Sequence, residues 1–311
     1  MERALRETGY MPNTLARNLR ARRTDMIALV LPDMTNPFFM TLAQGVETAA
    51  REAGISLILA NTDERDEEEQ RLVPMLLGRQ VDGLLVVPAG TGETTTRLCR
   101  ERGIPLVVVD RRPTTHGPDV VRADAGGGAH ELGRLLVGLG HRQMAVLSGP
   151  ASVPTAVDRV AGFRRAVAEE AGLPEPAVLH GDFTIESGHT MALAAMRGAP
   201  RPTALFAANN FIAIGVQHAL EELGLRVPGD VSIVGFDDLP PAMVTFPFLT
   251  VVAQPAFEMG RRAVGMLLER QADPEAPIQD VVLPTELVVR RSAGPAPGAP
   301  ASALGAAPTG P

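Results

Sequence analysis

The sequence contains no lysine, no tryptophan and a single cysteine, Cys99. Without lysine, the chain has no phosphate-loop lysine, no Schiff-base amine and no Ser-Lys nucleophile pair. One cysteine provides neither a disulfide framework nor a thiolate metal site. These absences exclude several classes of enzyme and metalloprotein.

Long apolar runs are absent as well. No stretch approaches the roughly 18 uncharged apolar residues that a membrane-spanning helix needs. Met1 is followed by charged residues instead of the apolar segment of a secretory signal. We therefore expect a cytoplasmic globular protein, and 311 residues with 45% hydrophobic content favour two domains.

Motifs that mark enzymes are also missing. The chain has no HExxH, no GxSxG and no phosphate-binding loop. DAGGGAHELG (124–133) is the nearest approach to a dinucleotide fingerprint, but Glu131 stands where the third glycine belongs. The six histidines are scattered, and His141, just after Gly140, is expected to be a helix cap or a surface residue. We predict no catalysis, no metal and no cofactor.

Positive charge is concentrated at the start of the chain. Residues 1–23 hold six arginines against two glutamates, a formal charge of +4, whereas the whole chain carries −7 and the remainder therefore −11. A basic leader on an acidic body is expected where only the leader meets a polyanion. The alternative from charge alone is a solvated, frayed terminus.

After residue 25, short β-branched and leucine-rich runs alternate with amphipathic stretches. This alternation predicts strands joined by crossover helices, and so a doubly wound parallel sheet. The same alternation of apolar runs and amphipathic stretches starts again near residue 142, which predicts a second sheet. The predicted strands are 26–33, 56–63, 82–89 and 104–110 in the first sheet and 142–150, 177–182, 202–209 and 231–238 in the second.

Polar and aromatic residues follow these runs. Ligands of open α/β sheets bind outside the carboxyl ends of strands, so such residues are candidates for a shared site. Carboxylates, amides, an arginine and aromatic rings are the mixture that recognises a sugar or nucleoside. Taken singly, each Asn or Asp is better explained as a helix cap, and only the convergence of several strand ends favours a site. The candidate segments are 33–39, 61–63, 124, 148–159, 182–183, 209–211 and 237–238.

These segments, in this order, resemble one family of transcription regulators. TDMIALVLPDMTNPFFMTLAQGVETAAREAG, DGLLVVPA, LGHRQMAVLSGP, DRVAGFRRAV, PTALFAANNFIAIGV and VPGDVSIVGFDD are similar to the effector-binding core of lactose-repressor/galactose-repressor (LacI/GalR) proteins. The resemblance runs from about residue 1 to about residue 292. It implies a periplasmic-binding-protein type I fold, with two α/β subdomains joined by three crossover strands and preceded by a short hinge helix.

The resemblance also assigns the arginine-rich leader. GYMPNTLARNLRARR (9–23) resembles the end of the family's DNA headpiece and its hinge helix, which in relatives pairs with a second copy and inserts a leucine into the minor groove. Most of the helix-turn-helix expected before residue 1 is lacking, through a late start site, a truncation or a true loss. The hinge residues implied to contact DNA are Asn13, Leu15, Ala16, Arg17, Leu19 and Arg20.

Carrying the family's effector site onto this chain gives a pocket between the subdomains. The aromatic residues stand at the mouth or stack on a ligand ring, Arg159 clamps the ligand, Asn209 binds hydroxyls, and Asp237 is the acid opposite. Asn210 replaces the more usual aspartate, and Val157 supplies no hydrogen-bond donor at its edge. The implied effector-binding residues are Phe38, Phe39, Asp124, Thr155, Val157, Arg159, Phe183, Asn209, Asp237 and Gln254.

The resemblance implies a regulator that acts as a repressor and whose small-molecule effector changes its DNA binding. The effector would be a sugar, sugar phosphate, polyol or nucleoside, and the other partners a second copy of the chain and, in a full-length form, operator DNA. The alternatives are a solute-binding protein without DNA binding and an enzyme on the same fold. The implied domains are 1–24 (headpiece remnant and hinge), 25–121 with 251–282, 122–250 with 283–292, and a disordered tail, 293–311.

Overall fold

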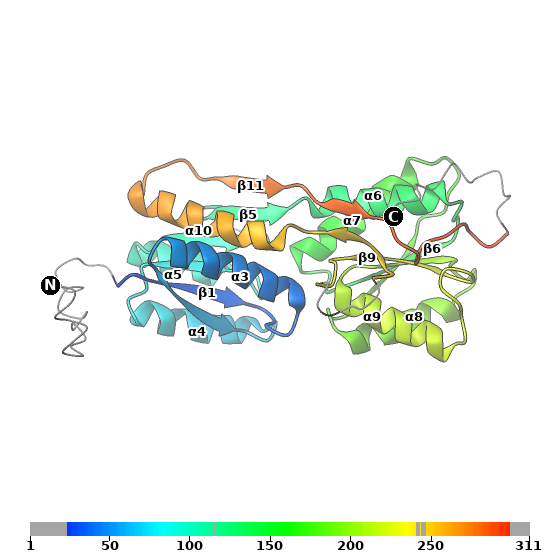
Figure 1. Cartoon of the computed structure of the whole chain (residues 1–311), viewed down its shortest axis with the longest axis horizontal. Coiled ribbons are helices and arrows are strands. Elements are labelled where there is room, and N and C mark those ends of the chain that lie inside the picture. The colour runs from blue at the N-terminus through cyan, green and yellow to red at the C-terminus, as the bar shows by residue number, and fades with distance from the viewer. Residues whose placement is uncertain (1–23, 115, 241–242, 244–246, 299–311) are drawn as a thin grey trace, which may run out of the picture.

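The computed structural model describes residues 24–114, 116–240, 243 and 247–298. Two lobes lie side by side along the long axis of the molecule, each built on a six-stranded sheet (Figure 1). This architecture confirms the predicted α/β fold with two sheets. The six hinge residues implied to contact DNA all lie outside the described residues.

All neighbouring strands of the first sheet are parallel, in the order β11-β5-β4-β3-β1-β2. The strands of this sheet are almost wholly buried at β1, β3 and β4, as expected for a sheet covered on both faces. Their bounds are β1 Met26–Leu31, β2 Ser56–Asn61, β3 Gly83–Val86, β4 Leu106–Val109, β5 Asp119–Ala123 and β11 Asp280–Leu283.

The second sheet has the order β12-β10-β9-β8-β6-β7. Its pairs are parallel except for β10 with β12, which is antiparallel. The bounds are β6 Met144–Ser148, β7 Ala177–His180, β8 Ala204–Ala207, β9 Ser232–Phe236, β10 Thr250–Ala253 and β12 Glu286–Val288.

Helices cover both faces of each sheet. In the first lobe, α3 and α10 bury one face, and α4 packs on the other beside α5. In the second lobe, α6 and α7 pack on one face and α8 and α9 on the other. The bounds are α3 Pro37–Glu52, α4 Asp66–Gly78, α5 Glu93–Arg102, α6 Ala125–Gly138, α7 Pro154–Ala168, α8 Ile185–Arg197, α9 Asn210–Glu222 and α10 Ala256–Ala272.

Asparagine side chains cap the N-termini of two helices that border the space between the lobes. The Asn36 side chain accepts a hydrogen bond from the Phe38 amide at 3.0 Å, with Pro37 as the first helical residue of α3. Asn209 caps α9 in the same way, accepting from the Ile212 amide at 2.8 Å. These caps place the helix N-termini at the carboxyl ends of the strands, where the two lobes face each other.

The chain crosses between the lobes three times, because β5 and β11 belong to the first sheet while β6–β10 and β12 belong to the second. The implied segment 251–282 of the first lobe begins inside β10, which pairs with β9 and β12 of the second sheet. Likewise, the implied boundaries 121/122 and 282/283 fall within β5 and β11. The crossings therefore lie at 123–125, 253–256 and 283–286.

Each of the eight runs predicted to be strands contains one, which confirms the alternating pattern. The predicted runs are longer than the strands because their last residues, such as Asp33 and Asp110, already belong to the loops. Four strands, β5, β10, β11 and β12, were not predicted from their own residues.

His141 is not the surface residue that one of the two expectations made it, although its backbone amide does cap α6 by donating to the Leu136 carbonyl at 3.1 Å. Its side chain is buried, with Nδ1 2.9 Å from Thr203 Oγ1 and Nε2 3.0 Å from the Gly294 carbonyl oxygen. Burial lowers the pKa of this imidazole. The amide of Ala296 also donates to the Leu139 carbonyl at 2.9 Å, so the predicted disordered tail does not begin at 293. Residues 299–311 lie outside the described part of the chain.

Candidate functional site

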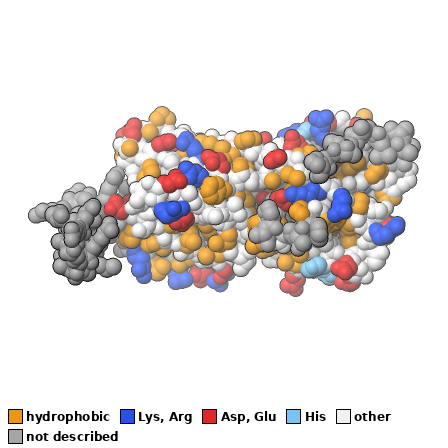
Figure 2. All heavy atoms as spheres, viewed as in Figure 1, with side chains coloured by type: hydrophobic (Ala, Val, Ile, Leu, Met, Phe, Trp, Pro, Cys, Tyr) orange, Lys and Arg blue, Asp and Glu red, His pale blue; other side chains and the backbone are white. Residues whose placement is uncertain are grey.

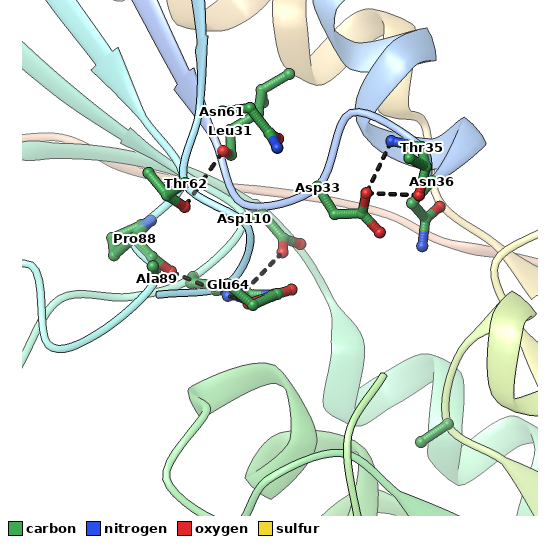
Figure 3. Close-up of polar contacts among 12 residues, drawn as sticks. Leu31, Asp33, Thr35, Asn36, Asn61, Thr62, Glu64, Pro88, Ala89 and Asp110 are labelled. Carbon is green, nitrogen blue, oxygen red and sulfur yellow. Dashed lines mark hydrogen bonds and ion pairs between the residues drawn. The ribbon is translucent and has the colours of Figure 1, made fainter. Parts of the chain in front are cut away.

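A cavity of about 650 Å³ lies between the lobes, at the carboxyl ends of both sets of parallel strands. Figure 3 shows Asp33, Asn36, Glu64 and Asp110 along the edge of the first lobe that faces the second. The lining residues are Asp33, Thr35, Asn36, Phe38, Phe39, Asp63, Glu64, Ala89, Asp110 and Arg111 from the first lobe, and Pro150, Ser152, Val153, Thr155, Arg159, Asp182, Phe183, Thr184, Asn209 and Asp237 from the second.

Arg111 dominates the wall that the first lobe contributes. Its two terminal nitrogens donate to the two Glu64 carboxylate oxygens at 2.6 Å each, and one also donates to the Pro88 carbonyl at 3.0 Å. The guanidinium carbon lies 6.0 Å from the Phe39 ring centre and 5.9 Å from the Phe183 ring centre. Arg111 therefore lies between aromatic rings from the two lobes, within the range of cation–π attraction.

Asp110 is buried at the end of β4 with a positive φ of 65°. That left-handed conformation is uncommon for a residue other than glycine, and such strained residues concentrate at functional sites. Burial raises the pKa of the Asp110 carboxyl to about 6, against the lowering effects of Arg159 and Arg111. Asp237 follows β9 in the same conformation, with φ 71°, and burial raises its pKa as well.

Arg159 and Asp237 form the corresponding pair in the second lobe. Arg159 Nη1 donates to the Ala208 carbonyl at 2.6 Å and lies 3.8 Å from Asp237 Oδ2. The guanidinium also stacks on Phe236, 3.9 Å from the ring centre. Gln254 Nε2 donates to Asp237 Oδ1 at 2.5 Å. Asp237, which lines the cavity, is thus contacted by Arg159 and by Gln254.

Two polar contacts join the lobes directly. Asn36 and Asn210 exchange side-chain amide hydrogen bonds of 3.1 and 3.0 Å, and both residues are buried. Arg112 Nη2 of the first lobe donates to both carboxylate oxygens of Asp158 at 2.6 and 2.8 Å. Because each contact needs groups from both lobes, both depend on how close the lobes are.

Three of the ten residues implied to bind effector do not line the cavity. Asp124 caps α6, accepting from the Gly127 amide at 2.8 Å. Val157 is 48% exposed, so the edge expected to lack a hydrogen-bond donor is not formed by it. Gln254 reaches the site only through Asp237. The other seven, Phe38, Phe39, Thr155, Arg159, Phe183, Asn209 and Asp237, are brought together in the lining.

Sequence reasoning missed Glu64, Asp110 and Arg111. Asp110 ends the predicted strand IPLVVVD, so the rule that selects residues after strands would have found it and Arg111. Glu64 lies three residues beyond the end of β2 at Asn61, just outside the candidate segment 61–63, in a left-handed conformation with φ 56°. Its role depends on Arg111, which is far away in the sequence.

A family model described as a periplasmic binding protein-like domain matches residues 134–293. The chain is 33% identical over 297 residues to the HTH-type transcriptional repressor PurR of Klebsiella pneumoniae, covering 94% of this chain and 87% of the relative. The chain belongs to the LacI family of transcriptional regulators.

Solved structures of LacI-family regulators have the same fold. One is a regulator from Enterococcus faecium with bound ribose, with a TM-score of 0.78 and 30% identity over 87% of this chain and 99% of that one. Another is the lac repressor dimer bound to operator and the anti-inducer ONPF, with a TM-score of 0.83 and 26% identity over 94% of this chain and 88% of that one. The relatives are repressors, in agreement with the prediction that this LacI-family chain is not an enzyme.

Carboxyl groups outnumber guanidinium groups around the cavity of this LacI-family chain. Six carboxyl groups line the cavity together with two guanidinium groups, and both guanidinium groups already bind protein oxygens. The carboxyl groups belong to Asp33, Asp63, Glu64, Asp110, Asp182 and Asp237, and the guanidinium groups to Arg111 and Arg159.

Within the described residues, no group of three or more His, Cys, Asp or Glu side chains is arranged to hold a metal ion. No helix in that part of the chain is long and apolar enough to cross a membrane.

Proposed function

We propose that this chain is an effector-responsive transcriptional regulator, acting as a cytoplasmic repressor, that binds a sugar or sugar derivative in the cavity between its lobes. The observation that carries the proposal is the cavity itself, in which polar strand ends from two lobes converge beside the aromatic rings of Phe39 and Phe183. Carboxylates and amides accept hydrogen bonds from hydroxyl groups, and an aromatic face stacks on a sugar ring.

The charge of the lining favours an uncharged effector over a sugar phosphate. A phosphate group would face six carboxyl groups, and its natural partners, Arg111 and Arg159, are engaged with Glu64 and with Ala208 and Asp237. The E. faecium relative was solved with ribose, a neutral sugar. Among the four effector classes considered, neutral sugars and polyols fit this lining better than phosphorylated ones.

Effector binding is coupled to DNA binding through the separation of the lobes. A ligand that contacts both lobes shifts the population toward one relative orientation, and a coupling of this kind amounts to about 1–3 kcal/mol. We propose that this chain acts as a homodimer, so that lobe movement changes how two arginine-rich leaders sit together on operator DNA. The face in Figure 2 has acidic and basic side chains interspersed over both lobes, which supports the leader, with its charge of +4, as the part that contacts DNA.

A ligand screen tests the effector assignment. Thermal shift with ribose, cellobiose, sorbitol, inosine and ribose 5-phosphate should raise the melting temperature with at least one neutral ligand and not with ribose 5-phosphate. Calorimetry on the best ligand then compares the wild type with Asp237→Asn, which replaces one carboxylate oxygen of the cavity lining by an amide donor. A phosphorylated ligand that binds more tightly than its neutral parent would contradict the charge argument.

DNA binding is tested separately, by anisotropy of a labelled duplex as salt is raised. Affinity should fall steeply with salt, because phosphate contacts release counterions. Arg17→Gln with Arg20→Gln should flatten this dependence. A chain that binds a neutral sugar yet has no salt-dependent affinity for duplex would instead be a solute-binding protein.

A further inference from the structure

Hydrogen bonds restrain the backbone where the chain enters the first lobe, at the end of the lobe that lies away from the second lobe (Figure 1). The Thr24 amide donates to both carboxylate oxygens of Asp82, at 2.9 and 3.0 Å, and the Asp25 amide donates to Asp82 Oδ2 at 2.8 Å. The Thr24 hydroxyl donates to the Gln80 carbonyl at 2.7 Å and lies 3.1 Å from Asp82 Oδ1. One carboxylate therefore holds two successive peptide groups.

Neighbouring strands fix the Asp82 backbone in turn. The Asp82 amide donates to the Met26 carbonyl at 2.8 Å, and the Ser56 amide donates to the Asp25 carbonyl at 2.8 Å. Residues 24–26 are thus threaded between the starts of β2 and β3, the two strands that flank β1. Hydrogen bonds to a charged acceptor are about twice as strong as those between neutral groups. The restraint is local and strong.

The same residue is joined to α10, which runs the length of the first lobe. Gln271 Nε2 donates to the Asp82 carbonyl at 3.0 Å from the last turn of this helix. The helix begins at Ala256, beside the crossing from the second lobe, and its 17 residues span roughly 25 Å. Thr24, Asp82 and Gln271 also line a hollow of about 1310 Å³ at this end of the lobe. One end of α10 lies at the crossing and the other at Asp82.

We propose that Asp82 is a positioning residue that sets the direction in which residues 1–23 leave the first lobe, and that Gln271 ties this anchor to α10. The positioning role of Asp82 does not depend on the proposed function. Only its expected effect on DNA binding rests on the proposal that residues 1–23 contact DNA. With the carboxylate in place, the backbone at Thr24 and Asp25 turns with the lobe as one body. Without it, rotation about these residues lets the leader move independently of the lobe.

Spin-label distances measure this directly. Nitroxides on Arg22→Cys and Glu47→Cys, in a Cys99→Ala background diluted with unlabelled chain, report where the leader begins relative to α3. We expect a narrow distance distribution in the wild type and a clearly broader one in Asp82→Ala and in Asp82→Asn. Asp82→Asn keeps the shape of the side chain, and so serves where the alanine variant fails to fold.

Asp25→Asn is the matched control. It removes the same charge from a residue that joins the anchor only through its backbone amide, and among the described residues its side chain makes no hydrogen bond. We expect this variant to keep the narrow distribution. An Asp82→Asn distribution as narrow as that of Asp25→Asn, in folded protein, would overturn the proposal.

The functional readout is the affinity for a fluorescein-labelled mixed-sequence duplex. We expect Asp82→Asn to bind the duplex several-fold more weakly than Asp25→Asn, although both have lost one negative charge and should gain equally in nonspecific attraction. Equal affinities would refute the positioning role. If the wild type does not bind the duplex but the distance distributions still differ, the anchor stands and the DNA-binding proposal falls.

Discussion

Two aspartates, Asp110 and Asp237, occupy equivalent places in the two lobes. Each follows a buried strand, β4 or β9, adopts a positive φ and lines the cavity. Each also has its pKa raised by burial. Strain and desolvation at the same residues mean that the protein retains them at a cost in stability, which is expected where the residues serve binding.

Asp110 makes stability depend on pH. Its pKa of about 6 in the folded protein lies above the ordinary value of 3.8, so the folded state binds the proton more tightly. The resulting stabilisation is fully present below about pH 4 and is lost as the pH rises through 6. Relative to Asp110→Asn, which mimics the protonated acid, the wild type should lose up to about 3 kcal/mol of unfolding free energy between pH 4 and pH 7. Urea unfolding of both proteins across this pH range measures the loss. Unfolding free energies that change with pH in the same way in the two proteins would contradict the prediction.

Arg159 should matter for stability as well as for binding. Removing it leaves Asp237 buried without its charge partner, which costs about 3–5 kcal/mol. Arg159→Ala combined with Asp237→Asn should recover part of that loss. Arg164→Ala is a matched control on the same helix, because its pair with Glu175 is solvent-exposed and should cost under about 1 kcal/mol. Chemical denaturation of the four proteins tests this, and an unchanged stability in Arg159→Ala would count against the pairing.

At this scale, the sequence predicted the residues that follow long apolar strands and missed those whose role depends on tertiary contact. Asp237 stands directly after the run VSIVGF and Asn209 directly after the run ALFAA, and both runs are recognisable by their apolar residues. The pairing of Asn36 with Asn210 joins residues 174 positions apart, and no local pattern brings them together. Asp124 shows the opposite error, because a strand-end aspartate is here an ordinary helix cap.

Among the elements, four strands were not predicted from their own residues, and the physical reason is plain for β5. β5 carries Asp119 and Arg122 within DVVRA, which interrupt the apolar pattern. The structure explains both charges, since Asp119 pairs with Arg270 at 2.9 Å and Arg122 pairs with Asp280 of the adjacent strand β11 at 3.0 Å. A strand whose charges are neutralised by distant residues cannot be recognised from its own sequence.

The packing of α3 against α10 depends on glycine at the contact. A Cβ on Gly260 would collide with the backbone of α3 at Leu42 and Val46, whereas a Cβ on Gly265 of the same helix would meet nothing closer than Arg262 Nη1 at 3.8 Å. The two helices therefore approach closely on one side of α10 only.

These two glycines give a matched pair of variants. Gly260→Ala should destabilise the protein by about 1–3 kcal/mol, because backbone atoms of α3 must move. Gly265→Ala should stabilise it by about 0.5–1 kcal/mol, the usual gain from replacing glycine within a helix. Thermal unfolding of both variants measures the difference. Similar effects of the same sign would show that the close approach is not as described.

At the scale of the whole molecule, the Asn36–Asn210 pair should hold the lobes together. Asn36→Ala also removes the cap of α3, so a double-mutant cycle with Asn210→Ala is needed to isolate the contact. The interaction energy between the two positions should be about 1 kcal/mol, typical of buried amide hydrogen bonds. It is measured from the unfolding free energies of the wild type, the two single variants and the double variant. Purely additive losses would mean that the lobes are not joined there in solution.

The two lobes are connected by three separate stretches of backbone, at 123–125, 253–256 and 283–286. A single covalent tether would let one lobe swivel freely, but three that run side by side resist twisting about the long axis and leave bending as the easy motion. Neither lobe is a continuous piece of chain, so one protease cut in a connection cannot set either free. The three connections thus favour a bending motion that opens and closes the space between the lobes.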